Sequence, residues 1–403
     1  MKFRFVLSLI LFFALFSACQ ARAPITQVER EDLFTLQIGR LEDQLALFDL
    51  DGDRGLRRAN IAMRNGLFYI SDSNGGKILR YTSYGDLLFM IYNQDINPPP
   101  LTLRPLSDTH LVTRWAVPHP LREPGKITVD SRQHIFVRDA LPYDRHSFDP
   151  ESRALLNNVI LHFDADGRFV NYIGREGIGG SPFPRIVGLF TSAGDELAVV
   201  CRVLAGWEIY WFSPEGILLF VVKLKANALP IPPDWEDVIP SLDKIAVCPD
   251  ARIIYVKVDY FRNIYDESTN IRTGIEPDGS VIWTMNAETG IWLSYVDVPF
   301  FEYSFTEQNR RVSIRVFYSL MGVISGGRAF LSFPVDGGYS ILIMHTEPGY
   351  GQQHQGFIRL DNCEMQFNVF DLSAEGILSG LLVNEWEVRL AWWRTDKLLR
   401  DGS

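Results

Sequence analysis

Residues 186–224 read IVGLFTSAGDELAVVCRVLAGWEIYWFSPEGILLFVVKL, and they contain the repeating unit from which the fold can be predicted. It contains four segments rich in β-branched and aromatic residues, as is typical of strands: 186–191, 197–203, 207–212 and 217–224. Short turns that contain glycine separate the segments. Such turns join antiparallel neighbours tightly, because glycine accepts positive φ. The stretch therefore predicts a four-stranded antiparallel meander.

The same unit recurs along the chain, in the segments 60–93, 126–173, 243–298 and 318–360. A sixth unit, 367–395, lacks a convincing fourth strand, and the N-terminal segment 33–39 resembles the missing one. A strand from the other end of the chain would leave no open edge between the first and last units. We therefore predict an all-β fold, a six-bladed β-propeller of four-stranded antiparallel blades closed by an N-terminal strand. The main alternative is a pair of β-sandwiches.

The N-terminus carries an export signal. Residues 5–16 are almost all apolar, Lys2 and Arg4 precede them, and Phe16-Ser17-Ala18-Cys19 follows. The run is too short to cross ~30 Å of hydrocarbon, which needs about 20 residues. Small residues before a cysteine resemble a bacterial lipobox, which implies removal of residues 1–18 and a lipid on Cys19. The alternative is ordinary cleavage nearby, with a soluble exported product.

One segment carries a family resemblance. Residues 68–78, FYISDSNGGKI, resemble the NHL-repeat signature, in which a strand ends in a small residue and Asp before a turn with Asn. Residues 135–139 match only its first half. Taken with its N-terminus, the chain resembles an NHL-type β-propeller lipoprotein of the spirochaete kind, a group of largely unassigned activity. The resemblance implies a propeller in which Asp72 and Asn74 form hydrogen bonds within the turn.

Charge and length limit the partners and the domain plan. The formal net charge is -10, so nucleic acid is an unfavourable partner. A polybasic patch is also missing, so membrane contact would come from the lipid alone. We expect a linker over 19–32, one propeller domain over 33–395 and a frayed tail over 396–403, with Trp392 and Trp393 packed in the last blade.

Long connections are predicted to gather on one face. Antiparallel order places the turns between strands two and three, and between blades, at the same end of the propeller. Nearly every insertion falls in that class: 93–125, 139–158, 225–243, 261–279 and 299–317. The exception, 346–355, falls on the other side or at the rim. Short turns on one side and long loops on the other are typical of a scaffold that displays a recognition surface.

Aromatic residues and a histidine in these connections are the candidate binding residues, since aromatic side chains are favoured at binding hot spots. They are Trp115, His119, Tyr143, Trp235, Tyr265 and Phe301. The alternative is that the loops pack on themselves above the hub.

Signals for chemistry are sparse. Asp49, Asp51 and Asp53 have the alternate spacing of a calcium loop, but Arg54 and Asn60 replace the expected Gly and Glu, so a solvated acidic turn is the default. No catalytic residue, zinc spacing or cofactor motif is found, and no cofactor is expected. Three further cysteines are expected to be buried free thiols, with a Cys201–Cys248 disulfide left open: Cys201, Cys248 and Cys363.

The sequence thus favours a non-catalytic propeller that is exported, anchored by lipid to a bacterial membrane, and binds an envelope protein or peptide. The membrane would be the outer membrane or the periplasmic face of the inner membrane. Two alternatives remain open at this stage. One is a metal-dependent hydrolase or lyase on an NHL-type propeller, and the other is a propeller that binds a small ligand or a glycan.

Overall fold

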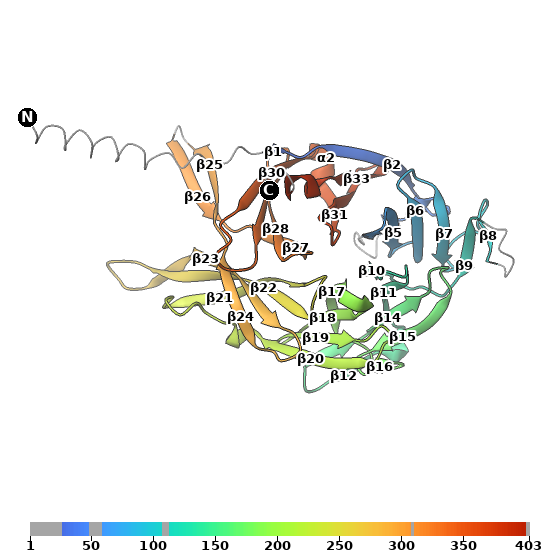
Figure 1. Cartoon of the computed structure of the whole chain (residues 1–403), viewed down its shortest axis with the longest axis horizontal. Coiled ribbons are helices and arrows are strands. Elements are labelled where there is room, and N and C mark those ends of the chain that lie inside the picture. The colour runs from blue at the N-terminus through green and yellow to red at the C-terminus, as the bar shows by residue number, and fades with distance from the viewer. Residues whose placement is uncertain (1–25, 48–58, 107–112, 308–309, 400–403) are drawn as a thin grey trace, which may run out of the picture.

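A computed structural model describes residues 26–47, 59–106, 113–307 and 310–399. Strands dominate these residues and radiate around a central axis (Figure 1). The described residues form six sheets of four to six strands and two separate two-stranded hairpins. In each large sheet one end strand lies nearest the axis, and the other strands follow outward in the order in which they pair.

The first three sheets come from the N-terminal half. The first contains β4 (Asn60–Arg64), β5 (Leu67–Asp72), β6 (Lys77–Thr82), β7 (Leu87–Tyr92), β9 (Trp115–Pro118) and β8 (Arg104–Pro105). The second contains β10 (Ile127–Val129), β11 (Ile135–Ala140), β14 (Asn158–Phe163), β15 (Phe169–Gly174) and β16 (Gly177–Ile178). The third contains β17 (Arg185–Thr191), β18 (Leu197–Val203), β19 (Gly206–Phe212) and β20 (Leu218–Lys225).

The other three sheets use the C-terminal half and the N-terminal strands. The fourth contains β21 (Val238–Val247), β22 (Ile253–Tyr265), β23 (Arg272–Asn286) and β24 (Trp292–Asp297). The fifth contains β27 (Ser319–Ile324), β28 (Arg328–Val335), β29 (Gly338–His345), β30 (Gln353–Arg359) and β1 (Thr26–Gln27). The sixth contains β31 (Phe367–Leu372), β32 (Leu378–Val383), β33 (Glu387–Trp393), β2 (Arg30–Ile38) and β3 (Gln44–Leu45).

The remaining elements are short. The two separate hairpins are β12 (Ser147–Asp149) with β13 (Ala154–Leu156), and β25 (Phe301–Glu307) with β26 (Arg310–Val316). The helical turns are η1 (Tyr143–Arg145), η2 (Ala193–Asp195), η3 (Ala226–Ala228), α2 (Asn362–Gln366) and η4 (Thr395–Leu399). No described helix has the length and apolar character needed to span a bilayer.

The inner strands form a closed ring. β4 contacts β10, and the contacts continue through β17, β21, β27 and β31 back to β4. The sheets therefore surround an axis instead of stacking in pairs, so the propeller prediction is confirmed and the sandwich alternative is wrong. Hydrophobic clusters fill the space between neighbouring sheets; one of them joins Val200 and Trp211 of the third sheet to Val256 and Val258 of the fourth.

The blade count differs from the predicted six. Five sheets contain a complete blade of four antiparallel strands from one stretch of the chain, so the structure has five complete blades. The sixth sheet is shared between the chain ends, because the C-terminal segment supplies only β31, β32 and β33. The N-terminal β2 supplies the fourth strand and pairs antiparallel with β33, with Leu36 opposite Val388. Extra strands also make four of the sheets wider than the predicted four-stranded pattern.

Two local predictions also need correction. The segment 261–279 is mostly not a loop, because β22 and β23 continue into it and their residues stay paired up to Tyr265 opposite Arg272. The tail is packed at its start: Leu398 and Leu399 of η4 lie against the cluster that contains the fully buried Trp393. Fraying from residue 396 is therefore wrong for 396–399.

Candidate functional site

The ring of inner strands encloses a cavity of about 690 Å³, and all six large sheets contribute to its wall. The wall is mostly strand backbone and small or apolar side chains, with ionisable residues at two levels. One level holds Lys126, Asp243, Lys244 and Asp371, and the other lies at the first turns of the sheets. A concave site with a few convergent polar groups is the usual form of a small-molecule site.

Lys244 stands in the wall of this cavity. Its Nζ donates a hydrogen bond to the backbone oxygen of Met321 at 2.5 Å. The Lys244 side chain is open to the cavity, but the protein that surrounds it there, together with the like charge of Lys126, lowers the pKa of Lys244 to about 8, although Asp243 and Asp371 oppose that shift. The Lys244 ammonium group is therefore still mostly protonated at pH 7 and loses its proton near pH 8.

Asp371 is one of the two acidic residues at this level. Its Oδ2 accepts a hydrogen bond from the backbone N–H of Met63 at 2.9 Å, which links the sixth sheet to the first. Burial raises the pKa of Asp371 to about 6, while the Met63 hydrogen bond and the charges of Lys126 and Lys244 act in the opposite direction. The three ionisable groups therefore influence one another across the cavity.

Asp243 has a mainly structural role. Its Oδ2 accepts a hydrogen bond from the backbone N–H of Leu320 at 2.9 Å and lies 3.3 Å from Nζ of Lys257. Lys257 is fully buried and also pairs with Asp259 at 2.6 Å. The Asp243 carboxylate thereby joins the fourth sheet to the fifth, and Lys257, behind the cavity wall, balances part of its negative charge.

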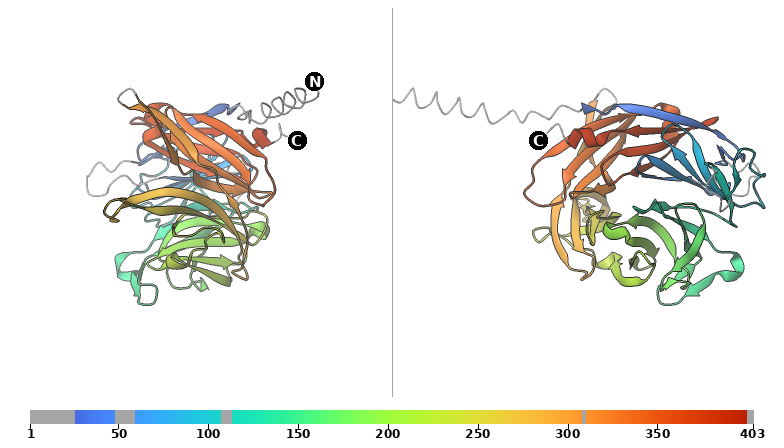
Figure 2. Two further views of the ribbon diagram at one scale, coloured as in Figure 1. Left: turned by 90° about the vertical axis from the view of Figure 1, so that its left-hand side faces the viewer. Right: turned by 45° about the vertical axis from the view of Figure 1, so that its right-hand side comes forward.

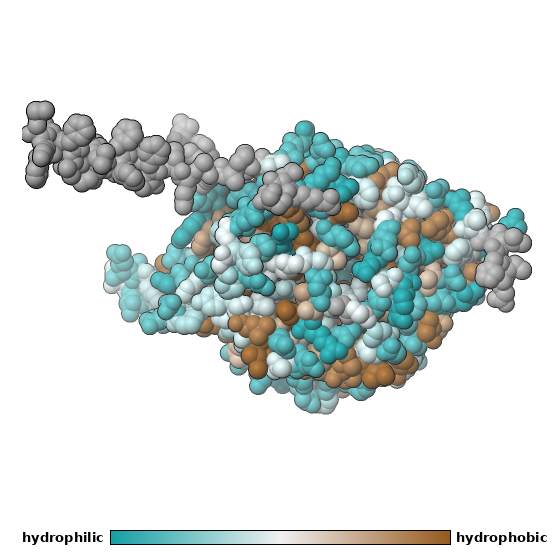
Figure 3. Space-filling model, viewed as in Figure 1, coloured by the Kyte–Doolittle hydropathy of each residue, from teal (hydrophilic) through white to brown (hydrophobic). Residues whose placement is uncertain are grey.

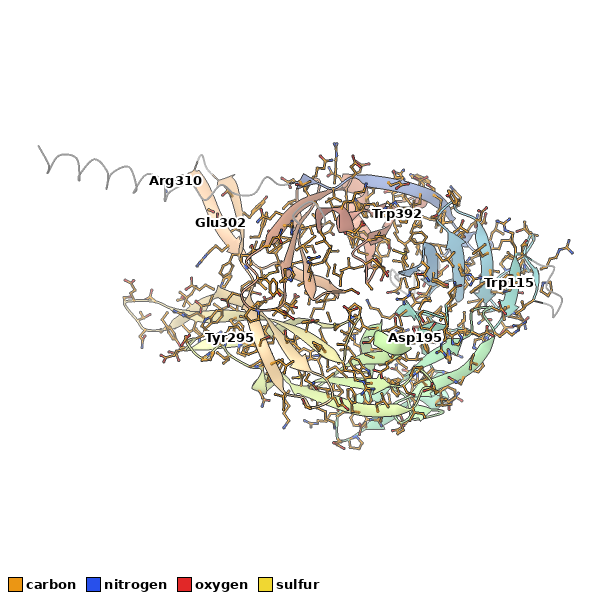
Figure 4. The ribbon with its side chains drawn as sticks, in the orientation of Figure 1. Trp115, Asp195, Tyr295, Glu302, Arg310 and Trp392 are labelled. Carbon is orange, nitrogen blue, oxygen red and sulfur yellow. The ribbon has the colours of Figure 1, made fainter. Side chains whose placement is uncertain are left out.

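At the other level, carboxylates clamp the first turn of one sheet to the first turn of the next. Asp195 accepts hydrogen bonds from the backbone N–H and hydroxyl of Ser131, both at 2.7 Å. Asp250 accepts hydrogen bonds from the Ser325 hydroxyl and the Gly326 N–H, both at 2.8 Å. Figure 4 shows Asp195 near the centre of the ring. These turn contacts hold this mouth of the cavity in a fixed shape.

A second candidate site is the face that carries three hairpins, which we name the hairpin face. The hairpins are β12–β13, the outer part of β22–β23 beyond Tyr260, and β25–β26. In the left view of Figure 2 they extend to one side, and the C-terminus lies on the other. Two of the predicted insertions behave differently: 93–125 contributes β9, which pairs with β7 at the rim, and 225–243 forms η3 and the start of β21.

The hairpin face presents apolar side chains to solvent. Those more than a third exposed are Tyr143, Phe148, Leu155, Ile239, Ile264, Tyr265, Ile271, Ile275 and Ile314. Another group lies at the outer edge, over β16 and β20, where Ile178, Ile217 and Leu219 are exposed. Figure 3 shows this second group as the apolar area along the lower rim.

The six predicted binding residues are not brought together. Trp115 lies at the outer rim (Figure 4), stacks on Phe89 and donates a hydrogen bond from Nε1 to the Asp166 backbone oxygen at 2.7 Å. His119 packs between Phe163 and Phe169, and burial lowers its pKa. Both residues hold the 93–125 segment against the rim.

The other four candidates divide into two packed and two exposed residues. Trp235 packs edge-on to Tyr260 at 5.0 Å, and Phe301 stacks on Phe333 at 4.7 Å. Tyr143 is 89% exposed and Tyr265 is 50% exposed. Loop self-packing therefore accounts for four of the six residues, and only Tyr143 and Tyr265 remain open to a partner.

Several predicted sites lie elsewhere. Cys19, Asp49, Asp51 and Asp53 fall outside the described residues. Within the described ranges, no group of three or more His, Cys, Asp or Glu side chains is placed to hold a metal ion. The three described cysteines are free thiols; Cys201 and Cys248 are buried and Cys363 is exposed. Burial raises the pKa of the Cys201 thiol.

In the signature turn Asp72 forms the hydrogen bond that the resemblance implies, whereas Nδ2 of Asn74 is buried without a hydrogen-bond partner among the described residues, so the expectation for the Asn74 amide is wrong. Asp72 ends β5 and accepts a hydrogen bond from the Gly75 N–H at 2.9 Å. Gly75 permits this approach because a Cβ atom there would collide with the Asp72 carboxylate. The same carboxylate also accepts a hydrogen bond from the Ala46 N–H at 2.8 Å, which the sequence did not indicate.

Sequence reasoning missed the charged residues of the cavity. An acid between Phe370 and Leu372, in a strand whose other polar residue is Asn368, was a usable signal for Asp371, because a carboxylate among apolar strand residues usually has a specific partner. Lys126 and Lys244 gave no comparable signal. A lysine near the start of a strand is ordinarily solvent-exposed, and only the ring brings these two near each other.

Comparisons with known proteins give distant likenesses. No family model matches the chain, and no curated protein matches it. The β-propeller domain of the Trilobed protease from Pyrococcus furiosus aligns with TM-score 0.39 and 9% identity, over 83% of this chain and 93% of that one. The WD40 domain of Toxoplasma gondii coronin aligns with TM-score 0.40 and 7% identity, over 93% of this chain and 88% of that one. The propeller assignment rests on the order of this chain's own sheets.

Proposed function

We propose that this protein is a non-catalytic binding propeller, held at a bacterial membrane by a lipid on Cys19, that takes an envelope protein or peptide on its hairpin face. The observation that carries the proposal is the set of exposed apolar residues on hairpins that extend from one face. Monomeric proteins rarely expose such groups together without a partner. Paired strands present them on a firm backbone, which lowers the entropy cost of binding.

The long β22–β23 hairpin contributes most to this surface. Ile264 and Tyr265 end one strand, and Ile275 lies opposite Asn263 on the other. The turn between the strands is ordered by Asp266, whose Oδ1 accepts hydrogen bonds from the backbone and side chains of Ser268 and Thr269. These contacts lower the pKa of Asp266 to about 2, so the turn keeps its charge and shape at neutral pH.

Site-specific photo-crosslinking in the producing bacterium tests the proposal. A photoreactive phenylalanine analogue replaces Tyr143 in one variant and Tyr265 in another. The matched control replaces Tyr84, which is 88% exposed in the β6–β7 turn on the opposite face. We expect a discrete protein adduct from Tyr143 and Tyr265 and none from Tyr84.

The outcomes separate the possible occupants. Adducts of equal yield at all three positions, or no protein adduct at any, would contradict a partner on the hairpin face. Adducts with lipid alone at Tyr143 and Tyr265 would replace the protein partner with the membrane surface. An adduct of twice the chain mass would identify a second copy of this protein.

The anchor has its own test. The Cys19→Ser variant should lose incorporation of a clickable fatty acid and move from the membrane fraction to the soluble fraction. Fatty acid incorporation that persists in this variant would contradict lipidation at Cys19.

We further propose that the sheet shared between the chain ends acts as a sixth blade, and that the propeller is of NHL type. The second sheet supports the NHL type. Asp139, near the end of β11, accepts hydrogen bonds from the Arg122 and Glu123 N–H groups, as Asp72 does from the Ala46 N–H. One domain over 33–395 should survive limited proteolysis as a single core. Early cleavage between two large sheets would contradict it.

A further inference from the structure

A pair of histidines in the second sheet lies apart from both the hairpin face and the axial cavity. Nδ1 of His134 is 3.0 Å from Nε2 of His162, and the two ring centroids are 5.1 Å apart. His134 comes directly before β11, and His162 lies in β14, the strand that pairs with β11. The pairing of these two strands therefore fixes the distance between the two imidazole rings.

One ring of the pair is held in place and the other is accessible. The His162 ring stacks on Phe136 with centroids 4.5 Å apart and 16° between the ring planes, and the residue is only 7% exposed. Asn171 lies directly opposite His162 on β15. By contrast, 24% of the His134 side chain is exposed, so a solute can reach the pair from solvent.

The nearest cation does not prevent a metal ion from approaching the pair. Arg132 acts on His162, but its Nη2 lies 3.3 Å from Oδ2 of the fully buried Asp130, and its Nε lies 3.7 Å from Oδ2 of Asp195. Oδ2 of Asp130 is also 3.8 Å from Nδ1 of His134. Two carboxylates therefore balance the one guanidinium beside the imidazoles, and one of them faces His134.

The distance within the pair suits two ligands of one metal ion. Two nitrogen atoms bound to one ion at about 2.1 Å are about 3.0–3.4 Å apart, for ligand angles of roughly 90–109°. The 3.0 Å between the two histidine nitrogens falls in this range. Neutral imidazole is the commonest protein ligand for transition metals. Burial and the neighbouring His134 lower the pKa of His162 to about 4, so at pH 7 no proton has to leave this ring before it can bind an ion.

We propose that His134 and His162 together bind one divalent transition-metal ion of the Zn²⁺ or Cu²⁺ kind, through Nδ1 of His134 and Nε2 of His162. In the free protein one of these nitrogens donates a hydrogen bond to the other. Binding transfers that proton to the second nitrogen of the same ring, so both facing nitrogens offer lone pairs and neither ring changes its charge.

The pair supplies two protein ligands, so water completes the coordination. Asn171 offers an oxygen beside the pair, because its Oδ1 is buried and forms no hydrogen bond of ordinary geometry among the described residues. A bound ion, or a water molecule on that ion, is the kind of partner that this oxygen lacks.

Isothermal titration calorimetry of the metal-free mature protein with Zn²⁺, Cu²⁺ and Mg²⁺ tests the proposal. We expect saturable binding of Zn²⁺, tighter binding of Cu²⁺ and no binding of Mg²⁺, which prefers oxygen ligands. His134→Gln and His162→Phe should each weaken Zn²⁺ binding tenfold or more. The matched control is His146→Gln, which removes another partly exposed histidine and should bind as the parent does.

Two further measurements distinguish ligation from a structural role. The electron paramagnetic resonance spectrum of the Cu²⁺ complex should show coupling to both histidine nitrogens in the parent and to only one in either variant. Zn²⁺ should also raise the urea midpoint of the parent and leave that of His134→Gln unchanged, because an ion that binds only the folded pair stabilises the folded state.

Three results would overturn the proposal. The first is equal Zn²⁺ affinity in the parent, His134→Gln and His162→Phe. The second is a Cu²⁺ spectrum that stays the same in both variants. The third is a loss of affinity in His146→Gln as large as in His134→Gln, which would place the ion elsewhere. The proposal depends on neither the hairpin face nor the lipid anchor, so the crosslinking results do not bear on it.

Discussion

Asp72 at the end of β5 accepts a hydrogen bond from the backbone N–H of Ala46 at 2.8 Å, so the turn signature also fastens the chain that enters the first sheet. Asp72 is almost fully buried, and the neighbouring Lys77 donates from Nζ to the backbone oxygen of Leu41 at 2.7 Å. Asp72, at the end of the second strand of the first sheet, therefore joins this sheet to the segment that follows β3 of the sixth sheet.

We expect Asp72→Ala to lower the free energy of unfolding by about 2–4 kcal/mol. The substitution leaves the Ala46 and Gly75 N–H groups without their acceptor and removes the carboxylate beside the buried Lys77. Urea unfolding followed by tryptophan fluorescence measures the change. Asp72→Asn keeps one acceptor oxygen and should fall between the parent and Asp72→Ala.

The exposed Glu385→Ala variant is the control for loss of a negative charge, and its stability should lie within about 0.5 kcal/mol of the parent. If Asp72→Ala and Glu385→Ala lowered the free energy of unfolding equally, the fastening role of Asp72 would be contradicted.

The strand pattern could be predicted because it depends on local alternation and turn chemistry. Leu197–Val203 is a strand with the predicted bounds, and the strand predicted over 207–212 begins one residue earlier, at Gly206. The short added strands β1 and β9 could not be predicted. Both pair in parallel with the outer strand of a sheet, and two or four residues give too weak a local signal.

The candidate site was less accessible to prediction for a geometric reason. Trp115 and His119 have the composition of recognition residues, but the segment that contains them folds onto the rim, where their rings fill gaps beside Phe89 and Phe163. Lys126 and Lys244 lie far apart in the sequence and meet only through ring closure. Sequence alone therefore indicated the hairpin face and not the charged residues of the axial cavity.

The buried Lys257 should be costly to neutralise. Lys257→Met leaves Asp259 and Asp243 without their cation, and we expect a loss of about 3–5 kcal/mol in the free energy of unfolding. Lys257→Met combined with Asp259→Asn should lose less than the sum of the single changes, with a coupling of about 1–3 kcal/mol. Urea unfolding of all four proteins measures the cycle, with the exposed Lys225→Met as control. Additive effects would show that the pair does not interact.

Asp139 should make stability fall as pH rises. Burial raises its pKa to about 6 against the hydrogen bonds from Glu123 and Arg122, whereas the unfolded value is about 3.9. The folded state therefore holds this proton more tightly. The contribution is complete below about pH 4 and is lost through pH 6, a change of up to about 3 kcal/mol.

Urea unfolding of Asp139→Asn and of the parent, at pH values on both sides of 6, measures this contribution of Asp139 to stability. We expect the difference between variant and parent to grow in favour of the variant as pH rises. A pH-independent difference would show that Asp139 titrates alike in both states.

His162 should change the stability with pH in the opposite direction to Asp139. It lies with Nε2 3.0 Å from Nδ1 of His134 and stacks on Phe136, and burial together with the His134 ring lowers its pKa to about 4. The unfolded chain takes up a proton near pH 6.5, while the folded chain does so only near 4. Stability contributed by neutral His162 is therefore present above about 6.5 and is lost as pH falls toward 4, by up to about 3 kcal/mol.

His162→Phe keeps the stack on Phe136 and removes the titration, so its stability relative to the parent should rise as pH falls through this window. Imidazole NMR titration measures the His162 pKa directly, and a value near 6.5 in the folded protein would contradict the assignment. Because Asp139→Asn gains relative stability toward high pH and His162→Phe gains it toward low pH, the two variants should tilt the stability profile in opposite directions. A common tilt would mean that some third group, and not these two buried side chains, governs the response of the second sheet to pH.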